Sequence, residues 1–427
     1  MLSFVALSQT SRMFRKKVFA SSQSFQRMTW KRLLKSRLTI AAMLCIGLAA
    51  LVAALGYLIT PDGTPFANRQ HIEISAQAPG FKANMLKMIR NEVMPKQSFF
   101  KTMLYGKKRK FSYIPFNDYY FENAEIVLTE FDPYPTLLQR EYRYHLANIT
   151  HALPGDLPPV KQQHDTLIFS DIHGHQHVYT IDELRNIVTG RHLIKRIFLL
   201  GSDRYGRDVL SQLMIGTRVS LSVGLISVLI SLVIGIFIGA LGGYFRGWVD
   251  IFVVWLINVV WSIPTLLLVI AITFALGKGF WQVFVAVGLT MWVEVARVVR
   301  GQVLSVREKE YVEAARALGY RNWRIIVKHI LPNVFGPVIV ISAANFASAI
   351  LIEAGLSFLG IGVQPPMPSW GTMIKENYAY IILDQAHLAI LPGLAIMVMV
   401  LSFMIIGNGL RDALDIKMVE KPGKLQA

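Results

Sequence analysis

Long stretches without a charged residue dominate this chain of 427 residues. A helix needs about 20 apolar residues to cross the core of a bilayer, because each residue rises about 1.5 Å. Five windows free of Asp, Glu, Lys, Arg and His reach this length, and a sixth, at 279–293, extends past Glu294 to about residue 296. Because the backbone finds no water inside lipid, these windows predict six transmembrane helices in an all-α polytopic membrane protein. The five long windows are 38–60, 219–245, 251–277, 330–352 and 388–410.

The distribution of basic residues orients the predicted helices. Residues 1–37 carry nine Lys or Arg and no acid, and the segment 297–328 carries eight against three acids. The positive-inside rule places both segments in the cytoplasm, and an even number of spans places the C-terminal tail there too. The stretch 61–211 holds 19 basic and 16 acidic residues and falls outside. The net charge of +17 thus fits a membrane protein, and no basic patch interleaved with aromatic residues indicates nucleic-acid binding.

These patterns divide the chain into five parts. They are a cytoplasmic basic arm at 1–37, a transmembrane helix at 38–60, an extracytoplasmic insert at 61–198, a transmembrane domain at 199–416 and a cytoplasmic tail at 417–427. The first helix is longer than the ~7–15 residues of a signal-peptide core, which predicts a retained anchor. Its Cys45 is the only cysteine, which excludes disulfides within the chain. Within the transmembrane domain we expect helices at about 217–244, 251–276, 280–299, 333–355 and 388–410, with a cytoplasmic loop at 301–332.

The insert has a composition of its own. Prolines punctuate it, alternating runs at 119–128 and 167–180 predict strands, and 81–90 predicts a short helix. Its length suits one small α+β domain. The side chains of His173, His175 and His177 alternate, so on a strand they would share one face, as metal ligands can. Exposed polar strand residues are the commoner case, and the three histidines remain metal candidates only.

The loop at 301–332 predicts two short helices joined at a glycine, an arrangement we call the elbow. Strong helix formers fill 307–318, and Gly319 can adopt the left-handed backbone that ends a helix. The second helix carries an apolar stripe at helical spacing, and Pro332 stops it or begins the next span. Small alanines leave a low surface that a partner's groove could accept. The stripe consists of Trp323, Ile326, Val327 and Ile330.

The elbow contains Glu-Ala-Ala-x3-Gly and ends in His-Ile-Leu-Pro-Asn, and in this it resembles the inner-membrane permease subunits of bacterial ABC importers. The family's signature continues with x9-Ile-x-Leu-Pro; His329 stands at its Ile position, a form typical of the peptide-importer branch. The stretches 200–224 and 353–371 resemble the C-type subunit of dipeptide and oligopeptide importers. The resemblance covers about 199–416 and the first span, but not the insert. The matching elbow residues are Glu313, Ala314, Ala315, Gly319, Leu331 and Pro332.

The resemblance implies the type I permease fold of ABC importers, in which the elbow docks into a cleft of a separate ATPase subunit. It implies no catalysis and no cofactor in this chain, because ATP and Mg²⁺ would be bound by two partner ATPase subunits. The other implied partners are a homologous permease subunit forming a heterodimer, an extracytoplasmic substrate-binding protein and membrane lipid. The implied location is the bacterial inner membrane, with both termini in the cytoplasm.

We therefore expect a permease subunit that moves di- and oligopeptides by alternating access, driven by ATP binding in its partners. Importers of nickel or glycosides share these motifs, so the substrate stays open. An ion-coupled secondary transporter usually shows repeated halves and broken helices, and no repeat is visible. A membrane-anchored enzyme acting through its insert is the third class. We expect the insert to be a docking surface for the binding protein or the partner subunit.

A few polar and small residues near the spans have two interpretations each. Gly239 and Gly243 lie four residues apart, as in faces that let helices approach closely, either within the chain or between subunits. Asp203 and Arg207 precede the second span and indicate either a surface near the pore mouth or a structural ion cluster. Glu353, near the outer end of the fifth span, could reach the interface or face a cavity.

Overall fold

The computed structural model describes residues 30–93, 97–132, 140–155, 160–277 and 279–414. Most of the basic arm and the tail from residue 415 therefore lie outside the described residues. The chain divides into two compact units, which we describe separately as the helical unit and the mixed unit. The helical unit comprises Met1–Ala50, Ser220–Val363 and Leu394–Ala427, and the mixed unit comprises Leu51–Val219 and Gln364–Gly393.

Five helices in the described residues are long and apolar enough to cross a membrane. The apolar windows account for these helices, but some of the helices extend beyond their windows. The helix of the window 219–245 begins at Val209, and the helix of the window 279–293 ends at Arg307. The fourth candidate span, Asn322–Phe358, includes the end of the elbow. The five contain α2 (Arg37–Ile59), α6 (Val209–Phe245), α9 (Phe280–Arg307), α12 (Leu331–Phe358) and α14 (His387–Leu414).

The span expected at 251–276 is not one continuous helix, so the expectation of a single helix there was wrong. It consists of α7 (Gly247–Trp261) and α8 (Thr265–Leu276), which bend by 89° at the break between them. Pro264 lies in this break; it has no N–H to donate and disfavours helical geometry in the preceding residue. The number of spans reaches six if this bent pair counts as one.

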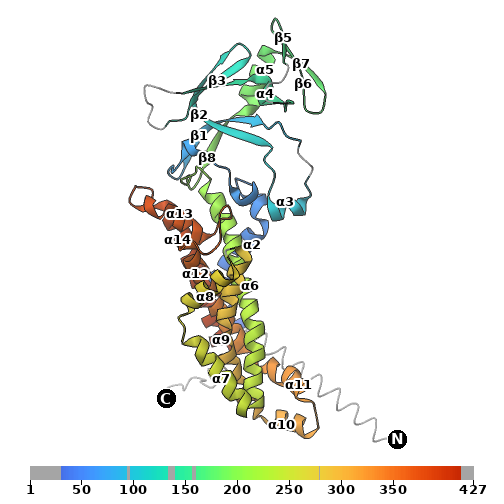
Figure 1. The fold of residues 1–427 in the computed structure, drawn as a ribbon, viewed down its shortest axis with the longest axis vertical. Helices are drawn as coiled ribbons and strands as arrows, with labels where there is room; N and C mark the ends of the chain where they lie inside the picture. Colours follow the sequence, from blue (N-terminus) through green and yellow to red (C-terminus); the bar gives the residue numbers. More distant parts are fainter. Residues whose placement is uncertain (1–29, 94–96, 133–139, 156–159, 278, 415–427) are drawn as a thin grey trace, which may run out of the picture. The chain divides into compact units, whose positions relative to one another are not determined.

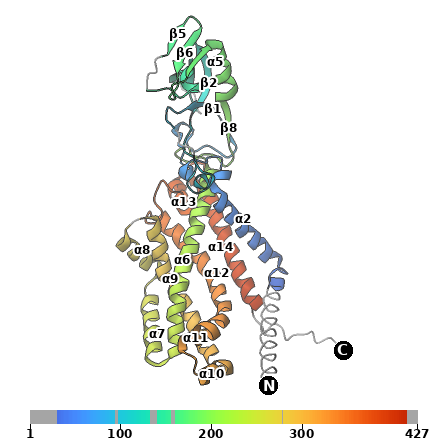
Figure 2. The same ribbon diagram turned by 90° about the vertical axis from the view of Figure 1, so that its right-hand side faces the viewer.

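Within the helical unit, α9 packs against α12 and against the glycine face of α6 (Figure 2). A Cβ added to Gly239 would lie 2.5 Å from the carbonyl oxygen of Ala296, and one added to Gly243 would lie 2.8 Å from that of Arg300. Both are closer than real Cβ contacts, so only glycine permits this approach. The small-residue face of α6 therefore serves packing within the chain.

The mixed unit contains two antiparallel sheets (Figure 1). The larger has the strand order β4-β3-β2-β1-β8, and the smaller has the order β5-β6-β7. The larger sheet is formed by β1 (Phe81–Ile89), β2 (Phe111–Glu122), β3 (Glu125–Glu130), β4 (Glu141–His145) and β8 (Leu193–Phe198). The smaller sheet is formed by β5 (Lys161–Gln163), β6 (Thr166–Ser170) and β7 (Gln176–Thr180). The helices of this unit include α3 (Phe99–Tyr105), α4 (Leu146–Thr150), α5 (Ile181–Ile187) and α13 (Trp370–Asn377).

The helix predicted at 81–90 is strand β1, so that prediction was wrong. This strand pairs with β2 on one side and β8 on the other, with Leu86 opposite both Ile114 and Leu193. Met85 and Leu86 are fully buried, on opposite faces of the strand. Pairing on both sides and burial on both faces outweigh the local helix propensity, which is a weak preference per residue.

The run 167–180, which predicts strand structure, is a hairpin of β6 and β7. The strands pair in register, with Phe169 opposite His177. The reversal falls at residues 171–175, where Gly174 has a φ of 82° that favours glycine. His173 and His175 thus lie in a turn and only His177 lies on a strand, so the three side chains do not share a strand face.

Candidate functional site

The elbow has the predicted helix–glycine–helix form. After α9 ends at Arg307, α10 (Glu310–Ala317) forms the first short helix, and α11 (Asn322–Ile325) begins the second. Between them Gly319 adopts a φ of 72°, the left-handed conformation that ends many helices. The turn η4 (Ile326–Ile330) is π-helical and leads directly into α12. The elbow is therefore joined at both ends to long helices without a flexible linker (Figure 2).

The inner face of the elbow packs on its own chain. Val312, Ile325 and Ile330 are fully buried and form a cluster with valines of α9 and α12. The predicted stripe is therefore divided: Ile326 and Ile330 are buried, whereas Trp323 is 63% exposed and Val327 is 39% exposed. The two buried residues of the stripe pack where the elbow covers the ends of α9 and α12. The other two residues of the stripe therefore stay exposed.

The six residues that match the family signature fall on both sides of this packing. Glu313, Ala314, Gly319 and Pro332 are exposed. Ala315 is buried in the cluster, and Leu331 packs against it as a partly buried residue. The exposed face also includes two large apolar side chains outside the signature, Leu318 at 73% exposure and Trp323.

Polar contacts join the elbow to α6. The hydroxyl of Tyr244 donates a hydrogen bond to Oδ1 of Asn322 at 2.8 Å. The guanidinium groups of Arg307 and Arg316 lie 5.7 and 5.9 Å from the centre of the Tyr244 ring. Sequence reasoning missed Tyr244, because it lies 78 residues from its partner and has no motif of its own.

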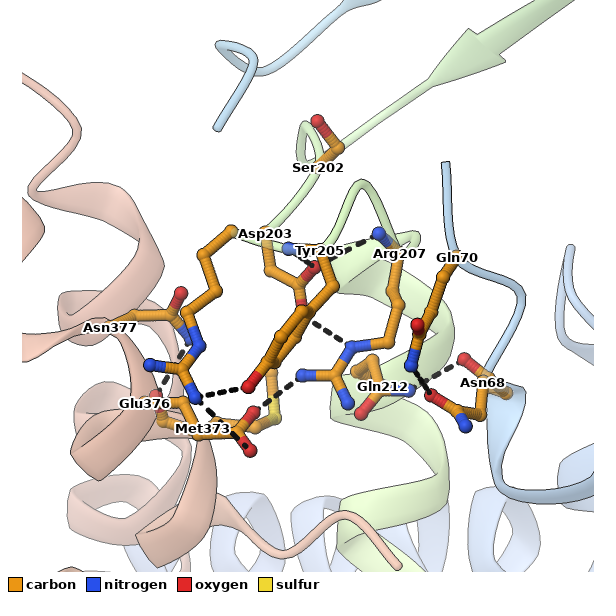
Figure 3. A network of polar contacts seen from close by, with 12 residues as sticks. Asn68, Gln70, Ser202, Asp203, Tyr205, Arg207, Gln212, Met373, Glu376 and Asn377 are labelled. Atoms are coloured by element: carbon orange, nitrogen blue, oxygen red, sulfur yellow. Dashed lines mark hydrogen bonds and ion pairs between the residues drawn. The ribbon is translucent and has the colours of Figure 1, made fainter. Parts of the chain in front are cut away.

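Asp203 and Arg207 belong to a buried ion cluster in the mixed unit (Figure 3). Nε of Arg207 lies 2.6 Å from Oδ2 of Asp203, and Nη2 lies 2.5 Å from Oε2 of Glu376 on α13. Burial lowers the pKa of Arg207, but the two carboxylates outweigh burial and raise it overall, so the group stays charged. The cluster joins the segment before α6 to α13, which supports the structural interpretation.

The side chain of Glu353 does not extend to the surface of the protein, where it could meet the membrane interface. Its side chain is fully buried in α12, and its carboxylate accepts hydrogen bonds from Ser220 on α6 at 3.2 Å and Ser357 at 2.7 Å. Buried polar groups are tolerated when they are hydrogen-bonded in this way. The contact with Ser220 is a polar connection between α6 and α12 inside the helical unit.

The histidine turn is organised around a single carboxylate. Asp171 accepts hydrogen bonds from the backbone N–H groups of His173 and His175, at 2.9 and 3.0 Å, and its other oxygen lies 3.1 Å from Nε2 of His177. The side-chain hydrogen bond with His177 is the main cause that lowers the pKa of Asp171. Throughout the part of the chain that the structure describes, no three His, Cys, Asp or Glu side chains are arranged to hold a metal ion.

Comparisons with known proteins place these features among transport subunits. Residues 231–420 match the family model described as "Binding-protein-dependent transport system inner membrane component". Over 219 residues, covering 51% of this chain and 72% of the relative, the chain is 42% identical to the glutathione transport system permease protein GsiD of Pectobacterium atrosepticum. Over another 219-residue alignment, covering 51% of this chain and 71% of the relative, it is 40% identical to the dipeptide transport system permease protein DppC of Alkalihalophilus pseudofirmus.

A solved structure also aligns, an inward-facing conformation of the MetNI methionine ABC transporter. The alignment has a TM-score of 0.40 at 20% sequence identity and covers 48% of this chain and 97% of the other. At this TM-score the alignment adds nothing to the sequence matches.

Proposed function

Because the chain belongs to the family of binding-protein-dependent transport system inner membrane components, we propose that it is the permease subunit of an ATP-driven peptide importer. The observation that carries this proposal is the 42% identity to a glutathione permease protein over 72% of that protein's length. A second relative is a dipeptide permease protein. Glutathione and dipeptides are both short peptides, so a short peptide is the proposed substrate. The chain is a transport subunit and not an enzyme.

The exposed face of the elbow is proposed as the docking site of an ATPase subunit. Leu318 and Trp323 leave large apolar surfaces in water beside the exposed carboxylate of Glu313. Burying one such side chain against a partner is worth roughly 1.5–3 kcal/mol. ATP and Mg²⁺ would be bound by the ATPase subunits. This chain would contribute only the surface to which the ATPase subunits bind.

The packing of the elbow supports a mechanical role. Its buried residues are part of the same cluster as Val303 of α9 and Val334 of α12, and Asn322 is hydrogen-bonded to α6. A close-packed cluster transmits displacement because it has no free volume in which to absorb it. Movement of the ATPase subunits would thus shift three long helices together, which favours one orientation of the transport path over the other.

The remaining assignments follow from charge and family. We place the chain in the bacterial inner membrane, with α7 and α8 together as one of six spans, the arm at 1–37 and the tail at 417–427 in the cytoplasm, and the insert at 61–198 outside. The basic arm and the basic segment 297–328 support this orientation. The proposed partners are a homologous permease subunit, two ATPase subunits and an external substrate-binding protein.

The docking proposal is tested with the double variant Leu318→Asp and Trp323→Ser. We expect the affinity for the ATPase subunits to fall at least tenfold, since each factor of ten corresponds to about 1.4 kcal/mol. The matched control is Val178→Asp, which changes a residue that is 58% exposed on β7. Unchanged ATPase affinity in the double variant would contradict the docking site.

The transport proposal needs a separate experiment. The chain, its partner permease, the ATPase subunits and the binding protein are reconstituted in vesicles, and uptake of a labelled dipeptide is followed. We expect uptake only with ATP and the binding protein. Uptake by the chain with an ion gradient and no ATPase would instead identify an ion-coupled secondary transporter.

A further inference from the structure

The short helix α3 is labelled in Figure 1. Its large apolar side chains are exposed. Phe99, Phe100 and Tyr105 are each more than 60% exposed, and Leu104 is 45% exposed. The rings of Phe99 and Phe100 contact each other edge to face, with centroids 5.7 Å apart. Exposed aromatic clusters of this kind mark a surface that meets another apolar phase.

The position of α3 is determined by contacts with α6 and with the chain that follows α2. Nη1 of Arg218 on α6 donates hydrogen bonds to the carbonyl oxygens of Met103 and Leu104, at 3.0 and 3.2 Å. The guanidinium of Arg218 also lies 5.9 Å from the ring centre of Tyr57 on α2. The charge-free run of α6 begins at the next residue, Val219. The helix α3 is therefore held at the level where the apolar run of α6 begins.

A second attachment points to the same level. The N–H of Lys107 donates to the carbonyl oxygen of Gly63 at 2.7 Å, four residues after the end of α2 at Ile59. Gly106 lies so close to this loop that an added Cβ would be 2.9 Å from the nitrogen of Pro65. The C-terminus of α3 is thus fixed beside the end of one apolar helix and the start of the apolar run of another.

Basic residues surround the aromatic face. Lys101 lies within α3, and the run Lys107-Lys108-Arg109-Lys110 follows it directly. The lysines in this set are exposed. Aromatic rings beside lysines are the pattern of helices that lie in a membrane interface, where rings sit among the headgroups and ammonium groups meet anionic phosphates.

We propose that α3 and residues 107–110 form a lipid-binding surface, with Phe99, Phe100, Leu104 and Tyr105 in the bilayer interface and the lysines on anionic headgroups. This surface requires that α6 crosses the bilayer, but it does not depend on what the protein transports. It attaches α3 to the membrane surface. A partner subunit is a less suitable occupant, because the face is attached through Arg218, directly before the residue where the apolar run of α6 begins, and its lysines match anionic headgroups.

Spin-label depth measurements on the full chain test this surface. In a Cys45→Ser background, single nitroxides are attached after Leu104→Cys, Tyr120→Cys or Leu229→Cys, and the chain is placed in nanodiscs containing phosphatidylglycerol. Leu104 and Tyr120 are both 45% exposed, which makes Tyr120 on β2 the matched control. Leu229, 52% exposed on α6, reports whether the span itself is in lipid.

We expect the ratio of oxygen to nickel-chelate accessibility to be several-fold higher at position 104 than at 120, and highest at 229. Equal ratios at 104 and 120, with a high ratio at 229, would overturn the lipid surface while leaving the span intact. A low ratio at 229 would overturn the membrane assignment of α6 and with it the surface. Protection at 104 that appears only when a partner permease is added would show a protein contact instead and also overturn the proposal.

A measurement on the unaltered chain guards against misfolded variants. Hydroxyl-radical oxidation in the same nanodiscs should spare Phe99, Phe100 and Tyr105 but modify Tyr120 and Tyr142. In nanodiscs of neutral phosphatidylcholine alone, Lys101, Lys107 and Lys108 should react faster with an amine reagent than in phosphatidylglycerol. Oxidation of Tyr105 as fast as that of Tyr120, or lysine reactivity independent of lipid charge, would contradict the proposal.

Discussion

The hydroxyl of Tyr244, in the last turn of α6, donates a 2.8 Å hydrogen bond to the side chain of Asn322, the first residue of α11. This bond joins the elbow to a helix that is distant from it in sequence. The elbow also packs through apolar residues on α9 and α12. Three long helices of the helical unit therefore respond to a force applied at one exposed surface.

Replacing this hydroxyl tests the connection to α6. For Tyr244→Phe we expect a loss of about 0.5–1.5 kcal/mol in the stability of the elbow packing, the usual net worth of one hydrogen bond. The ATPase subunits should still bind, but the stimulation of their activity by substrate should fall. The measurement is substrate-stimulated ATPase activity of the assembled complex. Tyr142→Phe, which removes an exposed hydroxyl that donates to Glu130, is the control and should have no effect.

The glycine face of α6 predicts an asymmetric response to alanine. In Gly239→Ala the new Cβ would lie 2.5 Å from the carbonyl oxygen of Ala296, so α6 and α9 must move apart at a cost of about 1–3 kcal/mol. Gly301→Ala, in α9, has no atom within 4 Å of the new Cβ and should be neutral or stabilising. Thermal unfolding in detergent measures both; equal melting temperatures would show that the two helices do not pack this closely.

The ion cluster around Arg207 predicts a large loss in the mixed unit. Arg207→Ala removes the buried guanidinium that pairs with Asp203 and Glu376 and leaves Glu376 only the more distant Arg204, at 3.9 Å, which costs roughly 3–5 kcal/mol. Arg143→Ala removes an exposed arginine, 2.7 Å from Glu122, and should cost at most about 1 kcal/mol. Hydrogen exchange near the start of α6 and in α13 measures the difference. If these segments are equally protected from exchange in both variants, the cluster contributes little to the stability of the mixed unit.

Acid should loosen the mixed unit. Burial and the nearby charges of Arg196 and Arg69 lower the pKa of His71 to about 4, from 6.5. A lowered pKa means that the folded state binds the proton less well than the unfolded state, so the contribution to stability is complete above pH 6.5 and disappears as the pH falls to 4. For this shift the loss approaches about 3 kcal/mol. Burial also lowers the pKa values of His145, His151 and His192.

Hydrogen exchange corrected for intrinsic rates, at pH 7 and pH 4.5, measures this effect. Exchange in β1 and in the segment around residue 71 should accelerate at the lower pH, while α9 and α12 change less. The variant His71→Gln, which cannot be protonated, should keep more of its protection at pH 4.5. Identical behaviour of His71→Gln and the unaltered chain would assign the acid sensitivity to other groups.

The sequence alone determined the long apolar helices and the form of the elbow. Four of the five long charge-free runs lie in one long span each, because in lipid a helix satisfies its own backbone, whereas the run 251–277 is bent at a break that contains Pro264. Gly319 likewise ends α10 through a backbone conformation that is local to one residue. The three signature stretches were sufficient to predict the family, which the relatives confirm. All these signals lie within a few residues of the feature they specify.

Only the tertiary structure decided the strand pairing, the buried ion cluster and the exposed face of the elbow. The segment 81–90 became a central strand because β2 and β8 flank it, and β8 lies more than 100 residues further along the chain. Glu376 pairs with Arg207 from a distance of 169 residues. In the elbow, Ile325 and Ile326 are the residues that become buried, whereas Trp323 stays exposed. Periodicity and propensity describe neighbours in sequence, whereas strand pairing, buried ion pairs and the choice of which apolar face is covered depend on residues that meet only in the folded chain.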